Sequence, residues 1–154
     1  MKKILVLVYS ILIISCSGNE DTVTEDGSCF STGERTYKWT MVTTWPKNFP
    51  GLGMASENFS KYVDEMTCGR MQIKVYGAGE FVPALGVFDA VSQGNVQLGH
   101  GASYYWTGKV KSSQFFTAVP FGLTAQEMNG WLHYGGGMEL WEEAYAPFNL
   151  IPLA

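Results

Sequence analysis

Charged residues and histidines are scarce in this sequence of 154 residues, and their scarcity excludes several classes of protein. Only 16% of the residues are charged, with 10 Lys and Arg against 14 Asp and Glu. No stripe of basic residues is present, which argues against a nucleic-acid-binding protein. His100 and His133 are the only histidines, and neither has a cluster of Cys or Asp beside it. The sequence therefore offers no structural metal site.

The motifs of nucleotide-binding proteins and of common hydrolases are also missing. Residues 77–79 and 99–101 each follow a predicted strand, but neither has the third glycine of a dinucleotide-binding loop. The sequence contains no Walker-type Gly-Lys-Ser/Thr, no Gly-x-Ser-x-Gly elbow and no Cys–His signature. His100 stands where a general base could act, but a hydrogen-bonded structural role is favoured. We therefore expect no catalytic residues and a protein that is not an enzyme.

The apolar run Ile4–Ile14 is too short to span a membrane core of about 30 Å, which takes about 20 apolar residues. It follows two lysines, an arrangement typical of a signal peptide. The segment ends in Ile-Ile-Ser-Cys and so resembles the bacterial lipobox, in which the cysteine receives a lipid. We expect cleavage after residues 1–15 and a lipid on Cys16 that anchors an extracytoplasmic protein to the membrane. A soluble exported protein is the alternative, but no small-x-small cleavage site follows promptly.

Residues 16–35 are predicted to form a flexible tether, because Ser, Thr, Gly, Asp and Glu dominate and apolar residues are almost absent. Export places the two remaining cysteines, Cys29 and Cys68, in an oxidising compartment. A disulfide between them would join the tether to the folded part. Nothing in their spacing requires this pairing, so it is left open.

Residues 36–101 predict alternating strands and helices. Strands are expected over residues 36–43, 70–79 and 96–101, where β-branched and other apolar residues are frequent, and the third is apolar enough to be buried on both faces. Prolines and glycines should prevent regular structure over residues 44–53. Helices are expected over residues 54–68 and 84–94. The apolar face of the first helix should comprise Met54, Phe59, Tyr62, Val63 and Met66. This order predicts an α/β fold with a mainly parallel sheet flanked by helices.

The remaining sequence predicts two helices between extended segments. Residues 112–122 contain an extended apolar stretch, and Thr124 with Glu127 forms a capping box that begins a helix. Gly135–Gly137 should break that helix, since each glycine costs roughly 1 kcal/mol relative to alanine. A second helix is expected from Met138 to Ala146, followed by a strand over 149–154. We interpret residues 36–154 as one lobe of a larger protein.

Aromatic residues make up 14% of the chain and occur where predicted strands end. Trp45 follows the first strand, and Tyr104, Tyr105 and Trp106 follow the third. In parallel sheets ligands bind beyond the carboxyl ends of the strands, so these rings should line one mouth. Side chains on an extended backbone alternate between faces, so at least one of Tyr104, Tyr105 and Trp106 should pack inward, and alternation suggests that only one of the two tyrosines contacts a ligand. Tyrosine hydroxyls that donate hydrogen bonds, beside rings that exclude water, suit the capture of a small ligand.

Four stretches carry a resemblance to a known family: YKWTMVTTWPKNFPGLG (37–53), VYGAGEFVPALGVFDAVSQGNVQLGHGASYYWTGK (75–109), FFTAVPFGL (115–123) and GGGMELWEEAYAPFNLIPLA (135–154). They resemble the solute receptors of TRAP (tripartite ATP-independent periplasmic) transporters, in particular the branch that binds 2-oxo acids and related monocarboxylates. The resemblance covers nearly all of the chain after residue 36.

The resemblance implies a periplasmic-binding-protein-like lobe, the N-terminal part of a two-lobed receptor that closes on a small organic acid. It implies delivery of this ligand to a membrane permease. Tyr104, Tyr105 and Trp45 match positions that contact the ligand, with Thr44 as a weaker candidate for a polar contact. The carboxylate-binding arginine, and most ligands of a metal cation beside the substrate, would lie in the missing second lobe. We expect no metal ligand within this chain.

A second interpretation is a surface adhesion or scaffold lipoprotein that uses the aromatic patch to dock a protein. A pocket closed by a second lobe would favour the receptor. A flat exposed aromatic patch would favour the scaffold.

Overall fold

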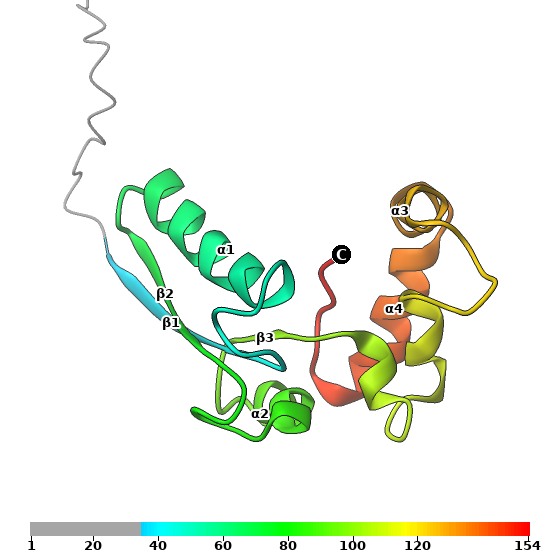
Figure 1. Ribbon diagram of the computed structural model, residues 1–154, viewed down its shortest axis with the longest axis horizontal. Coiled ribbons are helices and arrows are strands. Elements are labelled where there is room, and N and C mark those ends of the chain that lie inside the picture. Colours follow the sequence, from blue (N-terminus) through cyan, green and yellow to red (C-terminus); the bar gives the residue numbers. More distant parts are fainter. Residues whose placement is uncertain (1–34) are drawn as a thin grey trace, which may run out of the picture. The chain divides into compact units, whose positions relative to one another are not determined.

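The structure is a computed structural model that describes residues 35–154, and its first half is a parallel three-stranded sheet with flanking helices (Figure 1). The strands are β1 (Tyr37–Thr43), β2 (Met71–Tyr76) and β3 (Leu98–His100), in the order β2-β1-β3. Tyr37 pairs with Met71 at one end of the sheet, and Thr43 pairs with His100 at the other. The predicted parallel sheet is confirmed.

The helical connections cover opposite faces of this sheet (Figure 1). They are α1 (Leu52–Met66) between β1 and β2, and η1 (Ala84–Gly86) with α2 (Val87–Ser92) between β2 and β3. α1 lies on the face that carries the His100 side chain, because Ser56 Oγ is 2.7 Å from His100 Nδ1. α2 covers the other face, since a Cβ on Gly99 would lie 2.8 Å from Val87 and Val91.

The predicted apolar face of α1 is wrong. The helix turns its small residues inward, with Gly53 and Ser56 buried, while Met54, Phe59 and the other large apolar side chains of the helix are largely exposed. α1 also begins two residues earlier than expected, at Leu52. A Cβ on Gly53 would lie 2.0 Å from the carbonyl oxygen of Pro46, so the helix approaches the preceding loop too closely for a larger residue.

The third strand is also less buried than its composition predicts. β3 has only three residues and lies at the edge of the sheet, with Gly99 exposed and Leu98 and His100 half-buried. Its apolar residues therefore meet a helix on each face, but one edge of the strand has no strand partner among the described residues.

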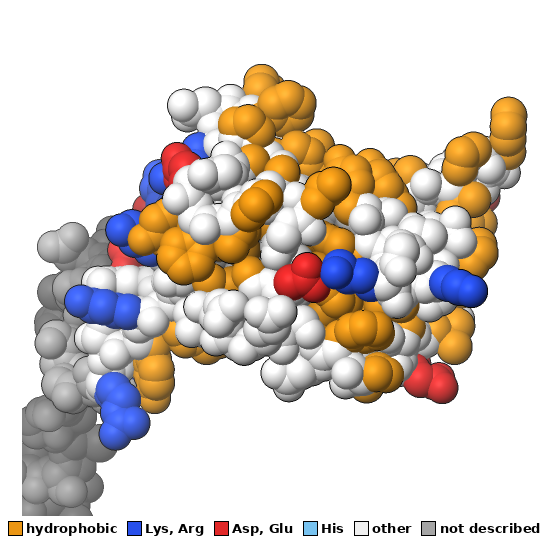
Figure 2. Space-filling model, turned by 90° about the horizontal axis from the view of Figure 1, so that it is seen from below, with side chains coloured by type: hydrophobic (Ala, Val, Ile, Leu, Met, Phe, Trp, Pro, Cys, Tyr) orange, Lys and Arg blue, Asp and Glu red, His pale blue; other side chains and the backbone are white. Residues whose placement is uncertain are grey.

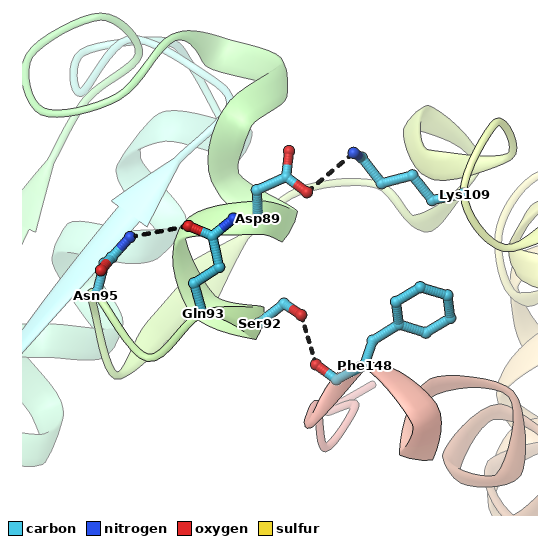
Figure 3. A network of polar contacts seen from close by, with 6 residues as sticks. All are labelled: Asp89, Ser92, Gln93, Asn95, Lys109 and Phe148. Carbon is cyan, nitrogen blue, oxygen red and sulfur yellow. Dashed lines mark hydrogen bonds and ion pairs between the residues drawn. The ribbon is translucent and has the colours of Figure 1, made fainter.

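The second half is helical and packs on α2 through aromatic rings. It comprises η2 (Ser103–Trp106), η3 (Lys111–Phe116), α3 (Ala125–Tyr134), α4 (Gly137–Tyr145) and η4 (Ala146–Phe148). Phe88 of α2 lies 5.7 Å from Trp106, 5.7 Å from Tyr145 and 5.3 Å from Phe148 between ring centroids. Two polar contacts support this junction (Figure 3): Lys109 Nζ is 2.9 Å from Asp89 Oδ1, and Ser92 Oγ donates to the Phe148 carbonyl oxygen at 2.6 Å.

Local signals located the helices of this half correctly, but not its extended segments. Thr124 and Glu127 form the predicted capping box, and Gly135 and Gly136 separate α3 from α4. The stretch predicted as extended instead contains η3. The predicted strand at 149–154 is wrong as well, because these residues are irregular and form no ladder in the described part of the chain.

Several predictions concern residues outside the described range, namely the signal peptide, Cys16 and residues 16–34 of the tether. Cys68, two residues after the end of α1, is disulfide-bonded. The pairing with Cys29 that the sequence left open concerns a residue outside the described range. Among residues 35–154, none of the helices has both the length and the apolar character needed to cross a membrane.

Candidate ligand-binding site

The carboxyl ends of β1 and β3 lie side by side in the sheet. The chain leaves β1 toward α1, which covers one face of the sheet, and it enters β3 from α2, which covers the opposite face. The backbone N–H of Thr44 donates to the carbonyl oxygen of His100 at 2.9 Å, just beyond the last paired residues. Such a topological switch point opens a crevice in which α/β proteins bind ligands.

Three aromatic residues meet at this crevice, and we call Trp45, Tyr104 and Tyr105 the aromatic mouth. The ring centroids of Trp45 and Tyr105 are 6.1 Å apart, and those of Tyr104 and Tyr105 are 4.7 Å apart. Trp45 is half-buried, while 42% of Tyr104 and 38% of Tyr105 remain exposed. The structure therefore brings together the three aromatic residues that the sequence singled out.

Both tyrosines are partly exposed, so exposure does not distinguish which of them contacts a ligand. Residues 103–106 form the 3₁₀ helix η2 rather than an extended strand, and alternation between faces does not apply. Ser103 and Trp106 are buried, so one of the three adjacent aromatics packs inward as expected. Ser103 Oγ donates to the carbonyl oxygen of Ser113 at 2.6 Å and fixes the turn that presents the two tyrosines.

The phenols of Tyr104 and Tyr105 are hydrogen-bonded to each other, so one of the two hydroxyl hydrogens is used within the pair. A hydrogen bond with Tyr105 raises the pKa of the Tyr104 phenol above its ordinary value, with smaller contributions from burial and from the charge of Tyr105. A protonated phenol donates one hydrogen bond and accepts others, which suits the oxygen atoms of a small acid.

Thr44 lies behind the mouth rather than on its surface. Its side chain is buried, and its Oγ1 has no hydrogen-bond partner among the described residues. A Cβ on the neighbouring Gly101 would lie 2.8 Å from Thr44 Cγ2 and 2.5 Å from the ring of Trp106. The absence of a side chain at Gly101 therefore leaves room for Thr44, after β1, and for the ring of Trp106.

Two contacts that the sequence did not predict hold the loops around the mouth. Lys47 Nζ is 3.0 Å from Glu80 Oε2, which also accepts the backbone N–H of Gly77 at 2.9 Å. The Gly77 N–H, followed by Lys47, lowers the pKa of the Glu80 carboxyl. The contact joins the loop after β1 to the loop after β2. Its only signal in the sequence was the position of Lys47 and Glu80 after successive strands.

His100 completes the inner side of the site. Its Nδ1 lies 2.7 Å from Ser56 Oγ and 3.4 Å from Thr43 Oγ1, and its ring centroid is 4.9 Å from that of Trp45. Burial lowers the pKa of its imidazole, so the ring is neutral at pH 7. The hydrogen-bonded role favoured from the sequence is confirmed, but Ser56 was missed because the buried face of α1 was misassigned.

An apolar cavity of about 150 Å³ lies apart from the exposed rings of the mouth. It is lined by residues of α2, β3 and α4 and by the irregular segment 150–153. Residues 97–99 and 150–153 both line this cavity, and residues 149–154 do not join the sheet. No group of three or more His, Cys, Asp or Glu that could hold a metal ion occurs within residues 35–154.

Comparison with known proteins identifies the family. The sequence profile of the bacterial extracellular solute-binding proteins of family 7 (DctP) matches residues 41–153. The chain belongs to this family. It is 47% identical over 114 residues to the monocarboxylate 2-oxoacid-binding periplasmic protein of Nostoc sp., which covers 74% of this chain and 31% of the relative.

Solved structures of the family agree with this assignment. A TRAP periplasmic solute-binding protein from Pseudoalteromonas atlantica, with bound sodium and pyruvate, is 48% identical with a TM-score of 0.74. The match covers 76% of this chain and 36% of that protein. A second, from Colwellia psychrerythraea with bound calcium and pyruvate, is 44% identical with the same TM-score and the same coverage. The chain thus spans about a third of the length of these relatives. The resemblance to the TRAP receptors is confirmed, and the comparisons support the receptor rather than the scaffold.

Proposed function

We propose that this chain is the N-terminal lobe of a TRAP transporter receptor that binds a small 2-oxo or 2-hydroxy monocarboxylate. The observation that carries the proposal is the aromatic mouth at the switch point, in a chain 44–48% identical to two pyruvate-bound receptors. The proposed role is capture and delivery to a membrane permease, without chemical conversion of the ligand.

Each residue of the mouth has a physical role in this proposal. One hydroxyl of the Tyr104–Tyr105 pair donates to an oxygen atom of the acid, and the indole of Trp45 forms a wall that excludes water. Excluding water strengthens the hydrogen bond, because a lower local dielectric increases its electrostatic energy. Thr44, whose Oγ1 is buried without a partner in the described part of the chain, remains the weaker candidate for a polar contact.

A second lobe would cover the exposed apolar surface of this one. On the face seen from below, hydrophobic side chains form several patches with polar and charged groups between them (Figure 2). Phe115, Phe121 and Ile151 are among the large apolar residues that are more than half exposed. We place the arginine that pairs with the ligand carboxylate on the second lobe, which closes over the mouth.

A cation like those in the two pyruvate-bound relatives would take most of its ligands from outside residues 35–154. The described residues do not fit a metal site on their own, since they bring no three His, Cys, Asp or Glu together. We also propose, from the lipobox, that a lipid on Cys16 anchors the receptor on the outer side of the cytoplasmic membrane and that the tether extends the lobe from the membrane surface.

Calorimetric titration of the receptor expressed from its intact reading frame tests the proposal. Pyruvate and related 2-oxo or 2-hydroxy acids should give saturable heats, while sugars and amino acids give none. Tyr105→Phe with Trp45→Ala should weaken pyruvate binding, and His133→Gln, on the exposed surface of α3, should not. Heat from sugars alone would overturn the assignment to organic acids.

A further inference from the structure

The His100 side chain is held by two buried hydroxyl groups on the inner side of the site. Ser56 Oγ is 2.7 Å from Nδ1 and Thr43 Oγ1 is 3.4 Å from the same atom. Ser56 is 3% exposed and Thr43 is 1% exposed, so neither hydroxyl exchanges freely with water. Both α1 and β1 therefore direct a polar group at one nitrogen of this ring.

The contacts at Nδ1 are compatible with a proton on either ring nitrogen. Ser56 Oγ, at 2.7 Å, can donate to an unprotonated Nδ1 or accept from Nδ1–H. Thr43 Oγ1, at 3.4 Å, also accepts the backbone N–H of Trp45 at 3.2 Å. Burial lowers the pKa of His100 and favours the neutral ring, which carries a single proton. In the tautomer whose Nδ1 accepts from Ser56, that proton is on Nε2.

The imidazole of His100 borders the aromatic mouth through Trp45, with 4.9 Å between the ring centroids, and Trp45 is itself 6.1 Å from Tyr105. Nε2 makes no hydrogen bond with residues 35–154, and it is not among the fully buried polar atoms that lack a partner there. A ring beside the mouth therefore has one nitrogen that no described residue uses.

We infer that His100 carries its proton on Nε2 and binds the ligand, donating from Nε2–H to an oxygen of the bound acid. The inference rests on the proposed function and adds a donor to the one that the pair of phenols offers. Because Ser56 and Thr43 hold Nδ1, the donor is oriented before the ligand arrives, and binding does not have to order it.

Two amide substitutions separate this role from a purely structural one. The amide of His100→Gln reaches the position of Nε2, whereas the amide of His100→Asn reaches that of Nδ1. If Nε2–H binds the ligand, His100→Asn should weaken pyruvate binding about tenfold or more, the loss expected for a hydrogen bond to a charged group, and His100→Gln should retain more of the affinity. A structural role through Ser56 alone predicts the reverse order.

Ser56→Ala and a measurement on the unaltered protein make the test independent of these two variants. Ser56→Ala removes the main donor to Nδ1 and should weaken binding several-fold without removing the imidazole. Nitrogen chemical shifts of the imidazole, measured by NMR with His133→Gln to assign the two histidines, should show the Nε2–H form.

Each outcome of the binding and NMR measurements leads to one conclusion. If the unaltered receptor binds no 2-oxo or 2-hydroxy acid, the proposed function fails and this inference fails with it. If it binds pyruvate but His100→Asn binds equally well, or if NMR shows a proton on Nδ1, only the role of His100 is overturned. Weaker binding in His100→Asn than in His100→Gln, together with the Nε2–H form, supports the inference.

Discussion

Gly101, Gly53 and Ser56 lie directly behind the larger side chains of the site. A Cβ on Gly101 would meet both Thr44 and Trp106, and Gly53 allows α1 to approach the loop that carries Trp45. Ser56 leaves room for the imidazole of His100 and supplies a hydrogen bond to it. The aromatic rings can gather at the strand ends because the residues behind them are small.

Gly101→Ala should therefore destabilise the lobe. The new methyl group would lie 2.5 Å from the Trp106 ring, which is buried and cannot move aside, and overpacking of this kind costs about 1–3 kcal/mol. Urea unfolding followed by tryptophan fluorescence measures the change in the free energy of unfolding. Gly108→Ala is the matched control, because a Cβ there meets no atom within 4 Å. Equal stability of the two variants would contradict this account of the strand ends.

At the scale of secondary-structure elements, the sequence predicted those whose signals are local. The capping box of α3, the glycines between α3 and α4 and the strands β1 and β2 all follow from neighbouring residues. The buried face of α1 does not, because it depends on how closely the helix approaches the Pro46 loop. The 3₁₀ turn at Tyr104 and Tyr105 also depends on a distant contact, from Ser103 to Ser113, and no periodicity in the sequence indicates it.

The gathering of Trp45 with Tyr104 and Tyr105 was predictable for a different reason. The order of strands and helices indicated a parallel sheet, and a parallel sheet places the carboxyl ends of its strands at one edge. The partner of His100 was not predictable, since it required the correct face of α1. The topology of the sheet was thus enough to locate the site. Which hydroxyl groups contact His100 depends on how α1 packs on the sheet.

The capping box gives a direct test at this scale. Thr124→Ala removes the side-chain acceptor for the Glu127 backbone N–H and should cost about 1 kcal/mol of stability. Thr124→Ser keeps the hydroxyl and should restore most of the loss. Thermal unfolding monitored by circular dichroism compares the three proteins. If Thr124→Ser were as unstable as Thr124→Ala, the capping box would not stabilise the start of α3.

At the scale of the whole molecule, the lobe presents one wall of a site and a large apolar surface. The phenols of the mouth are about 40% exposed, so a ligand resting on them would remain largely in contact with water. Tyr134 is 93% exposed and Ile151 is 84% exposed, although both are large apolar residues. These features are what a receptor lobe would show in the absence of the lobe that closes over it.

Residues 17–154 expressed alone should accordingly be poorly soluble and bind no measurable pyruvate. The arginine that we place on the second lobe would be missing, and the apolar surface would favour self-association. Calorimetry and analytical ultracentrifugation of this chain, beside the receptor from the intact reading frame in the same buffer, measure both expectations. The intact receptor serves as the control, because it should be monodisperse and bind pyruvate. A saturable isotherm for residues 17–154 with the affinity of the intact receptor would show that the described lobe holds the ligand by itself, and the second lobe would then have to be assigned to release or delivery rather than to capture.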